Sequence, residues 1–133
     1  MYDSCIMDRN ELTYAIRGAA FKVHSKLGPG LLESVYERCL TYELRKRFHV
    51  ETQLAVPFTY DTLQIDVGYR MDIVVENTVV IELKATEKIL PIHSAQLLTY
   101  MRLSKISLGL LMNFNVSNMQ TGIKRYIMEK GMK

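Results

Sequence analysis

The sequence has 133 residues, of which 48% are hydrophobic and 23% charged, with a formal net charge of +3. These are ordinary values for one globular domain that buries its own core, and the mild positive charge permits a nucleic-acid partner without arguing for one. The two cysteines form no CxxC pair, the three histidines are too scattered for a zinc site, and no apolar run is long enough to cross a membrane. We therefore expect one cytoplasmic domain over residues 1–133, in a compartment that keeps thiols reduced.

Two amphipathic helices are expected at the start of the chain. Apolar residues recur at helical spacing over residues 10–27, with Asn10 as the N-cap, and a Gly-Pro-Gly turn ends this helix. A second helix is expected over residues 31–48, with Glu33 in its first turn, where the helix dipole favours a carboxylate that has no catalytic role. We interpret Arg45-Lys46-Arg47 as cations that stabilise the carboxyl end of this helix.

Alternation of apolar and polar residues then predicts three strands. Residues 50–60 alternate, and Pro57 confines this strand to an edge of the sheet because proline has no amide donor. After a short turn, residues 65–75 and 79–85 repeat the pattern. Residues 76–78 between them are turn material, so the last two runs predict a β-hairpin.

A third helix is expected from Pro91, which suits the first turn of a helix, to about Leu103. Its polar side carries His93, Gln96 and Tyr100 at helical spacing. Taken alone, these residues decorate a surface more often than they act as ligands. The residues expected to pack inward are Ala95, Leu98 and Met101.

The remaining segments complete a mixed sheet. Residues 106–114 form a nearly continuous apolar run, which is typical of a strand buried on both faces. Because this run follows a helix that follows the strand at 79–85, the three segments predict a right-handed βαβ unit. Residues 122–128 supply a last short strand or an extended arm. The expected fold class is α/β, a mixed β-sheet flanked by helices in the order α-α-β-β-β-α-β-β.

The predicted hairpin brings two acids together. A three-residue loop sets Asp72 directly opposite Glu82, with Lys84 diagonal to Asp72. Opposed residues have Cβ atoms roughly 5 Å apart, and two like charges there are destabilising unless a cation lies between them. Mg²⁺ would resolve the repulsion, since two carboxylates and the carbonyl of Leu83 are a sufficient protein contribution. Lys84 would then lie where it could polarise water or stabilise charge on a phosphate.

The same four charges allow a structural interpretation. Asp72 could pair with Lys84, and Arg70 with Glu82, as two ion pairs on the surface of the sheet. Each such pair would contribute little to stability. The hairpin by itself leaves both interpretations open.

The chemistry-bearing residues, taken together, resemble a known family. Asp72, then Glu82-Leu83-Lys84, then Gln96 and Tyr100 on the next helix, resemble the PD-(D/E)XK nuclease superfamily, whose core order of helix, three antiparallel strands, helix and strand is the order expected here. More narrowly, the chain looks like the small bacterial and archaeal GxxExxY proteins over roughly residues 10 to 128. The matching segments are Gly30-Leu-Leu-Glu33-Ser-Val-Tyr36, Tyr69-Arg-Met-Asp72, Glu82-Leu-Lys84-Ala85, His93-Ser-Ala-Gln96 with Tyr100, and Gly109-Leu-Leu-Met-Asn-Phe114.

The resemblance implies a restriction-endonuclease-like fold and a role for each matching residue. It implies metal binding, of Mg²⁺ or Mn²⁺, by Asp72 and Glu82, catalysis by Lys84, and an accessory carboxylate at Glu33. The helix motif would orient the site or touch the nucleic-acid strand. The residues expected to position substrate are Gln96, Tyr100, His93, Arg70 and Tyr36.

Two functions of different kinds follow from these expectations. The first is a Mg²⁺-dependent nuclease that hydrolyses phosphodiester bonds of DNA or RNA with metal-activated water. The second is a catalytically silent module that binds nucleic acid or protein on the same fold, with Tyr36, Tyr69 and Tyr100 as a contact surface. Hydrolysis of a small phosphorylated molecule is a third option. A domain this small carries no visible recognition module, so specificity would need a homodimer or a protein partner, and no membrane is involved.

Overall fold

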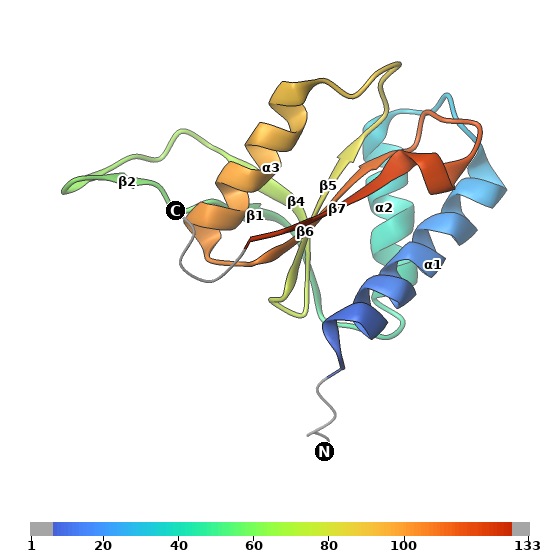
Figure 1. Ribbon diagram of the computed structural model, residues 1–133, viewed down its shortest axis with the longest axis horizontal. Helices are drawn as coiled ribbons and strands as arrows, with labels where there is room; N and C mark the ends of the chain where they lie inside the picture. The colour runs from blue at the N-terminus through green and yellow to red at the C-terminus, as the bar shows by residue number, and fades with distance from the viewer. Residues whose placement is uncertain (1–6, 129–133) are drawn as a thin grey trace.

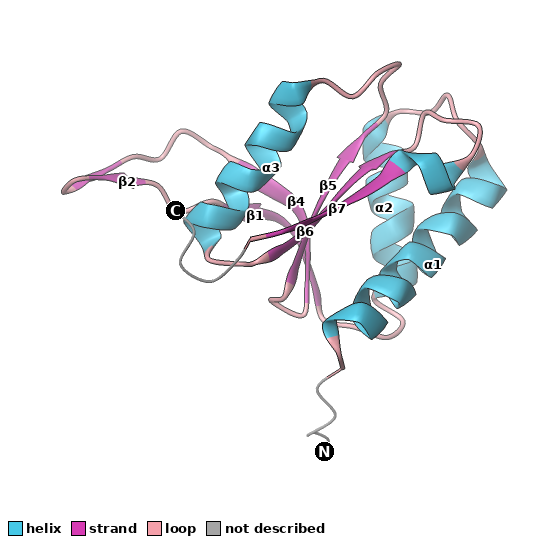
Figure 2. Cartoon of the chain, viewed as in Figure 1, coloured by secondary structure: helices cyan, strands magenta, loops and turns pink. Residues whose placement is uncertain are grey.

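A mixed sheet of five strands forms the centre of the computed structural model, which describes residues 7–128 (Figures 1 and 2). The strands are β1 (Val50–Ala55), β4 (Arg70–Val75), β5 (Val79–Lys84), β6 (Leu108–Asn113) and β7 (Ile123–Ile127). They lie in the order β1-β4-β5-β6-β7, and only β5 and β6 are parallel among these neighbours. This confirms the predicted meander, the βαβ unit and the final strand, which a short 3-10 helix, η1 (Met119–Gly122), precedes.

Helices cover both faces of this sheet. They are α1 (Arg9–Leu27), α2 (Glu33–Leu44) and α3 (Pro91–Ser104). One apolar cluster joins α1 and α2 to one face, and a second cluster joins α3 to the other (Figure 2). The predicted α/β architecture, a mixed sheet flanked by helices, is confirmed.

The N-cap of the first helix lies two residues earlier than the sequence pattern indicated. Asp8, and not Asn10, is the N-cap of α1. The Asp8 carboxylate accepts the amide N–H of Asn10 over 2.7 Å, and the Glu11 carboxylate accepts the amide N–H of Asp8 over 3.2 Å. This reciprocal capping box satisfies amide groups that have no partner inside the helix.

The second helix is shorter than predicted. It ends at Leu44, so the basic run at residues 45–47 lies beyond its last turn. The Arg45 guanidinium donates from Nη2 to the Val50 carbonyl over 3.1 Å and so joins the end of α2 to β1. The run still lies at the carboxyl end of α2, with Arg45 as the C-cap, so its interpretation as cations that stabilise this end stays a prediction.

Residues 56–69 differ most from the prediction. They contain a separate hairpin, β2 (Thr59–Tyr60) with β3 (Leu63–Gln64), which projects from the body of the protein (Figure 1). The alternation at 50–60 and 65–75 therefore does not mark two continuous strands. Every residue of β2 and β3 is exposed, so the alternation there has no core to face. The predicted edge position of the first strand is confirmed, because β1 ends the sheet, but Pro57 lies two residues past the end of β1 at Ala55 and not within the strand.

The register of the central hairpin agrees with the predicted three-residue loop. Val75 pairs with Val79, and the pairing continues back to Ile73 opposite Ile81. Glu76 and Asn77 in the loop both have positive φ angles, of 53° and 51°, which a tight reversal requires. The next residues beyond this ladder are Asp72 and Glu82.

Side chains of β1 and β4 change faces within the sheet. Met71 packs with the α3 cluster, although strict alternation from Ile73 would place it with α1 and α2. Leu54 on β1 also packs with the α3 cluster. The change occurs where Gln53 faces Asp72, and Gln53 has a φ of 52°, outside the strand region. Such a break reverses the face of the sheet toward which the side chains beyond it point.

The inward face of α3 is rotated relative to the prediction. Met101 is buried as predicted, but Ala95 is exposed and Leu98 only half-buried. Leu97 and Tyr100 take the inward positions instead, since Leu97 lies three residues before Tyr100 and four before Met101 and so borders both on one side of α3. A Cβ at Gly109 on β6 would meet Met101 Sδ at 2.5 Å, so glycine lets α3 approach the sheet closely.

We expect Gly109→Ala to lower the free energy of unfolding by ~1–3 kcal/mol, because the added methyl group would overpack the contact with Met101. Chemical denaturation measures this change. Gly18→Ala is the matched control, because Gly18 lies in α1 with nothing within 4 Å of an added Cβ. It should stabilise the protein through helix propensity by ~0.5–1 kcal/mol. Equal effects of the two substitutions would contradict this account of the α3 contact.

Candidate active site

Asp72 on β4 and Glu82 on β5 are joined by hydrogen bonds that replace the regular ladder. The amide N–H of Asp72 donates to Glu82 Oε2 over 3.0 Å, and the amide N–H of Leu83 donates to Asp72 Oδ2 over 2.9 Å. Each carboxylate thus accepts from the backbone of the neighbouring strand, which fixes both side chains. The two acids are therefore neighbours, as the predicted register requires.

Burial dominates the electrostatics of this pair. Glu82 is 4% exposed, and its burial, together with the negative charge of Asp72, raises its pKa to about 8. Burial also raises the pKa of Asp72, although the Leu83 amide and the Lys84 ammonium oppose the shift. Two neighbouring buried carboxylates resist ionising together unless a counter-charge is supplied.

Two more carboxylates approach this pair from α2. Glu33 begins the helix and is half-buried, and its pKa is raised by burial and by the charge of Asp72. Glu37 lies one helical turn later, and its pKa is raised by burial and by Asp72. The sequence reasoning missed Glu37. Its spacing of four residues from Glu33 on one helix face was the available signal.

Gln53 on β1 connects Glu37 to Asp72. Its Nε2 lies 3.1 Å from both carboxylate oxygens of Glu37 and 3.4 Å from Oδ1 of Asp72, and donates to both groups. Gln53 was also missed, although extending the antiparallel register places it opposite Asp72. Its positive φ is the kind of backbone strain that clusters at functional sites.

Lys84, the last residue of β5, supplies the positive charge near these acids. Its ammonium lowers the pKa values of Glu33, Asp72 and Glu82. The alternative of two surface ion pairs is not realised. Among residues 7–128, no salt bridge involves Asp72, Glu82, Lys84 or Arg70, and the Arg70 guanidinium donates to the Tyr69 carbonyl over 3.3 Å.

Asn113 holds the chain that follows Lys84. It lies beside Lys84 at the end of β6 and is 4% exposed. Its Nδ2 donates to the Thr86 carbonyl over 3.0 Å, and its Oδ1 accepts the amide N–H of Thr86 over 3.1 Å. A buried polar residue within the apolar run 106–114 was the sequence signal for this clamp, and the prediction overlooked it.

The residues expected from α3 have different surroundings. Tyr100 is 6% exposed, and its pKa is raised by burial and by the charge of Glu82. Its ring centroid lies 6.1 Å from that of Tyr69. Gln96 is half-buried one turn earlier on α3. His93 Nδ1 accepts the amide N–H of Leu90 over 3.0 Å and so caps the helix, which accounts for this residue without a substrate contact.

Tyr36 has a structural role in place of the predicted contact with substrate. It is fully buried and stacks on Phe114 with ring centroids 4.7 Å apart. Its hydroxyl donates to the Gly28 carbonyl over 2.6 Å and accepts the amide N–H of Leu31 over 3.1 Å. The expectation that Tyr36 positions substrate, or contributes to a contact surface with Tyr100, is wrong because both side chains are buried. Tyr36 instead fixes the turn that leads to Glu33.

A model of the PD-(D/E)XK nuclease superfamily matches residues 10–126, which is most of the chain. The chain belongs to the PD-(D/E)XK nuclease superfamily. Its mixed sheet flanked by helices is consistent with the restriction-endonuclease-like fold of that superfamily, whose nucleases are generally dependent on a divalent metal. Searches of curated proteins and of solved structures gave no match. None of the helices within residues 7–128 has the length and apolar character needed to cross a membrane.

The donor set of this superfamily member fits a hard divalent cation. Within the described residues, no three His, Cys, Asp or Glu side chains form a ready-made metal cluster. Mg²⁺ does not need one, since it is commonly held by one or two carboxylates and keeps several waters. Asp72 and Glu82 offer two oxygen donors for such an ion, and the pKa values of Glu33 and Glu37 beside them are raised as well. Such an excess of buried negative charge is what a cation offsets.

Proposed function

We propose that this protein is a divalent-metal-dependent nuclease that hydrolyses phosphodiester bonds of DNA or RNA, with Mg²⁺ or Mn²⁺ as its cofactor. The observation that carries the proposal is the buried Asp72–Glu82 pair beside Lys84. Membership of a nuclease superfamily supports the same activity. The burial of Tyr36 and Tyr100 argues against the alternative of a silent module that uses them as a contact surface.

In this proposal Asp72, Glu82 and the backbone carbonyl of Leu83 hold the metal. When bound, the ion supplies Lewis-acid chemistry, polarising the phosphodiester and lowering the pKa of water. The hydrogen bonds from Leu83 and Gln53 orient the Asp72 carboxylate before any ion arrives. This preorganisation reduces the cost of assembling the site.

The other residues of the site act on the substrate or on its protons. The Lys84 ammonium stabilises the negative charge that develops on the phosphate. Glu33, whose pKa is raised by burial and by the charge of Asp72, is placed to accept and return a proton. Tyr100, beside Glu82, and Gln96 orient the site from α3, and Arg70 is exposed where it can contact a phosphate.

We further infer that the chain is a GxxExxY protein, because each residue of that motif has a distinct role here. Gly30 has a φ of 102°, which a residue with a side chain rarely adopts. Glu33 faces Asp72, and Tyr36 bonds to the turn that contains Gly30. The spacing of the motif thus places one carboxylate at the site and anchors it from the core.

The remaining parts of the proposal concern the setting of the enzyme. We propose a single catalytic domain over residues 1–133, whose ends at 1–6 and 129–133, including Cys5, lie outside the described residues. The free, half-buried thiol of Cys39 supports a reducing, cytoplasmic location. Sequence or structure specificity would come from a second copy or a protein partner.

A cleavage assay with four substrates tests the proposed activity. Plasmid DNA, single-stranded DNA, RNA and nucleotides are incubated with Mg²⁺, with Mn²⁺ or with EDTA. We expect metal-dependent cleavage of at least one polymer and none in EDTA. Cleavage of nucleotides alone would favour a small-molecule phosphodiesterase, and no cleavage of any substrate would favour the silent module.

A further inference from the structure

A row of basic and aromatic side chains lies along α2 and just past its end. Tyr42 lies four residues after Arg38, and Arg45 and Lys46 lie three and four residues after Tyr42; all four side chains are exposed. We call these four residues the α2 strip. A shallow depression of about 480 Å³ runs beside them. Its lining residues are Glu37, Arg38, Thr41, Tyr42, Arg45, Lys46 and Thr52.

This part of the surface holds the positive charge of the chain. A second depression, which shares Arg38 and Tyr42 with the first, adds Lys22, Lys26 and Glu43. Five cations and two carboxylates line the two depressions, an excess of three positive charges. The whole chain has a formal charge of +3, so the rest of it is neutral overall.

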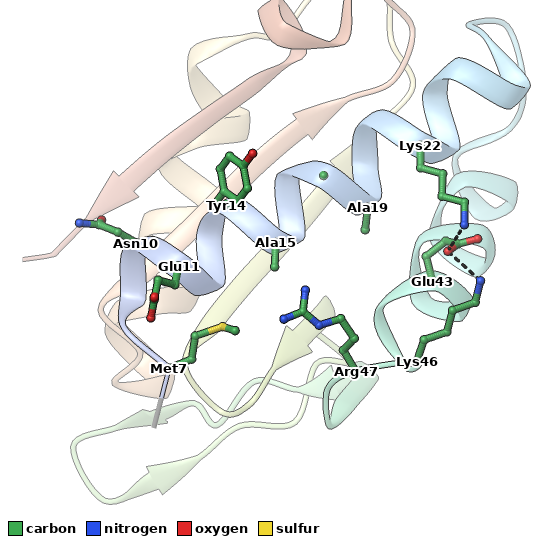
Figure 3. A pocket seen from close by; sticks show the side chains of 11 residues that line it. Met7, Asn10, Glu11, Tyr14, Ala15, Ala19, Lys22, Glu43, Lys46 and Arg47 are labelled. Atoms are coloured by element: carbon green, nitrogen blue, oxygen red, sulfur yellow. Dashed lines mark hydrogen bonds and ion pairs between the residues drawn. The ribbon is translucent and has the colours of Figure 1, made fainter. Parts of the chain in front are cut away.

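The negative charge of Glu43 within this region is already neutralised. Lys22 and Lys46 reach it from α1 and from the end of α2, at 3.1 and 3.0 Å, as Figure 3 shows. Arg47 lies close by on the wall of a hollow between the two helices (Figure 3). No carboxylate within residues 7–128 forms a salt bridge with Arg38 or Arg45. These two guanidinium groups therefore keep their charge for an anionic partner.

Two uncharged residues of the depression also indicate a ligand. Tyr42 is 67% exposed, and Lys46 Nζ lies 5.0 Å from its ring centroid, so an accessible aromatic face stands among cations. Exposed aromatic rings beside basic residues are the usual stacking platforms for unpaired bases. Thr41 is 6% exposed, and its Oγ1 has no hydrogen-bond partner in the described part of the chain. Unsatisfied buried hydroxyl groups are uncommon and need an explanation.

The α2 strip leads directly to the candidate active site. Glu37, at one end of the depression, accepts hydrogen bonds from Gln53, which also donates to Asp72. From Arg38 to Lys46 the row extends for roughly 12 Å at the rise of a helix. A polyanion approaching four carboxylates would be repelled without such a row of cations beside them.

We propose that the α2 strip binds a single strand of nucleic acid and leads it to the Asp72–Glu82 pair. Arg38, Arg45 and Lys46 contact successive phosphates, and a base stacks on Tyr42. This inference rests on the proposed nuclease function for the direction of the strand, but the binding itself needs no catalysis.

The test measures binding without turnover. Fluorescent single-stranded DNA and RNA of equal length are titrated with the full chain in EDTA at several salt concentrations. Arg38→Gln/Lys46→Gln is expected to weaken binding at least 10-fold at low salt. It should also reduce the slope of log affinity against log salt by about 1.4, because each phosphate contact to a single strand contributes about 0.7. Tyr42→Ala should weaken binding roughly 5- to 150-fold with an unchanged slope.

A matched control removes equal charge elsewhere. Lys124→Gln/Arg125→Gln lies on β7, at the opposite edge of the sheet from β1, where Lys124 also stands over a ring, that of Tyr126. This double variant should bind single-stranded nucleic acid with the affinity of the unmodified chain. If both double variants lose affinity equally, or if neither does, the α2 strip is not the binding site. Duplex DNA of the same length is titrated in the same way. If Tyr42→Ala weakens binding of the duplex as much as binding of the single strand, the assignment to single strands is wrong.

Cleavage by the unmodified chain is measured separately with Mg²⁺ and Mn²⁺. Binding that depends on the α2 strip without any cleavage would support the strip and remove the proposed activity. Cleavage by a protein whose binding does not depend on the α2 strip would support the proposed activity and remove the strip. Circular dichroism and thermal unfolding verify that each variant is folded, and recovery of binding in Arg38→Lys would show that the positive charge is what matters.

Discussion

Asp72→Asn is expected to lower the rate of metal-dependent cleavage on the order of 10²- to 10³-fold, the loss typical of removing one group that stabilises charge in a transition state. The carboxylate charge disappears, while a side-chain oxygen of similar shape remains to accept the Leu83 amide. The fold should therefore survive. Cleavage assays measure the rate, and calorimetry with Mg²⁺ and Mn²⁺ should show that the variant binds metal weakly or not at all.

Asp61→Asn is the control for this substitution. Asp61 lies in the exposed turn between β2 and β3 with a φ of 56°, a conformation that asparagine adopts readily. Its cleavage rate and metal binding should match those of the unmodified protein. If Asp72→Asn cleaves and binds metal as well as Asp61→Asn, the proposed active site is wrong.

The hairpin could be predicted from sequence because its determinants are local. Three turn residues fix the loop, the loop fixes the register, and the register makes Asp72 and Glu82 neighbours. A single strand, however, cannot reveal where its own alternation breaks. The phase change at Gln53 and Asp72 depends on contacts among β1, β5 and α2, so Gln53 and Glu37 emerged only from the structure.

Burial explains the other errors in the site. Tyr36 and Glu33 lie three residues apart on one helix, so their spacing alone places both on the side of α2 that carries the site. The helix directs Tyr36 into the core against Phe114 and leaves Glu33 half-buried near Asp72. Helical spacing shows which residues share a side of α2, but the depth of each side chain depends on what packs against it.

The buried charge also predicts an unusual dependence of stability on pH for the metal-free protein. The pKa of Glu82 is about 8 in the folded chain, compared with 4.5 for an unperturbed glutamate. Between these values the folded state retains a proton that the unfolded state has lost. The free energy of unfolding should therefore be greatest below about pH 4.5 for this group and fall as pH rises through 8, by roughly 5 kcal/mol in total.

Glu82→Gln should flatten this curve, because a neutral amide can still accept the Asp72 amide N–H and never ionises. Denaturation in EDTA from pH 5 to 9 should show the variant more stable than the unmodified protein at pH 8 and above. A smaller slope should remain, since the pKa values of Asp72, Glu33 and Glu37 are also raised. Glu87→Gln, at an exposed glutamate, should keep the original curve. If stability depends on pH in the same way for the unmodified protein and for Glu82→Gln, Glu82 ionises at no cost to the fold. The site would then have no uncompensated negative charge for a metal ion to neutralise.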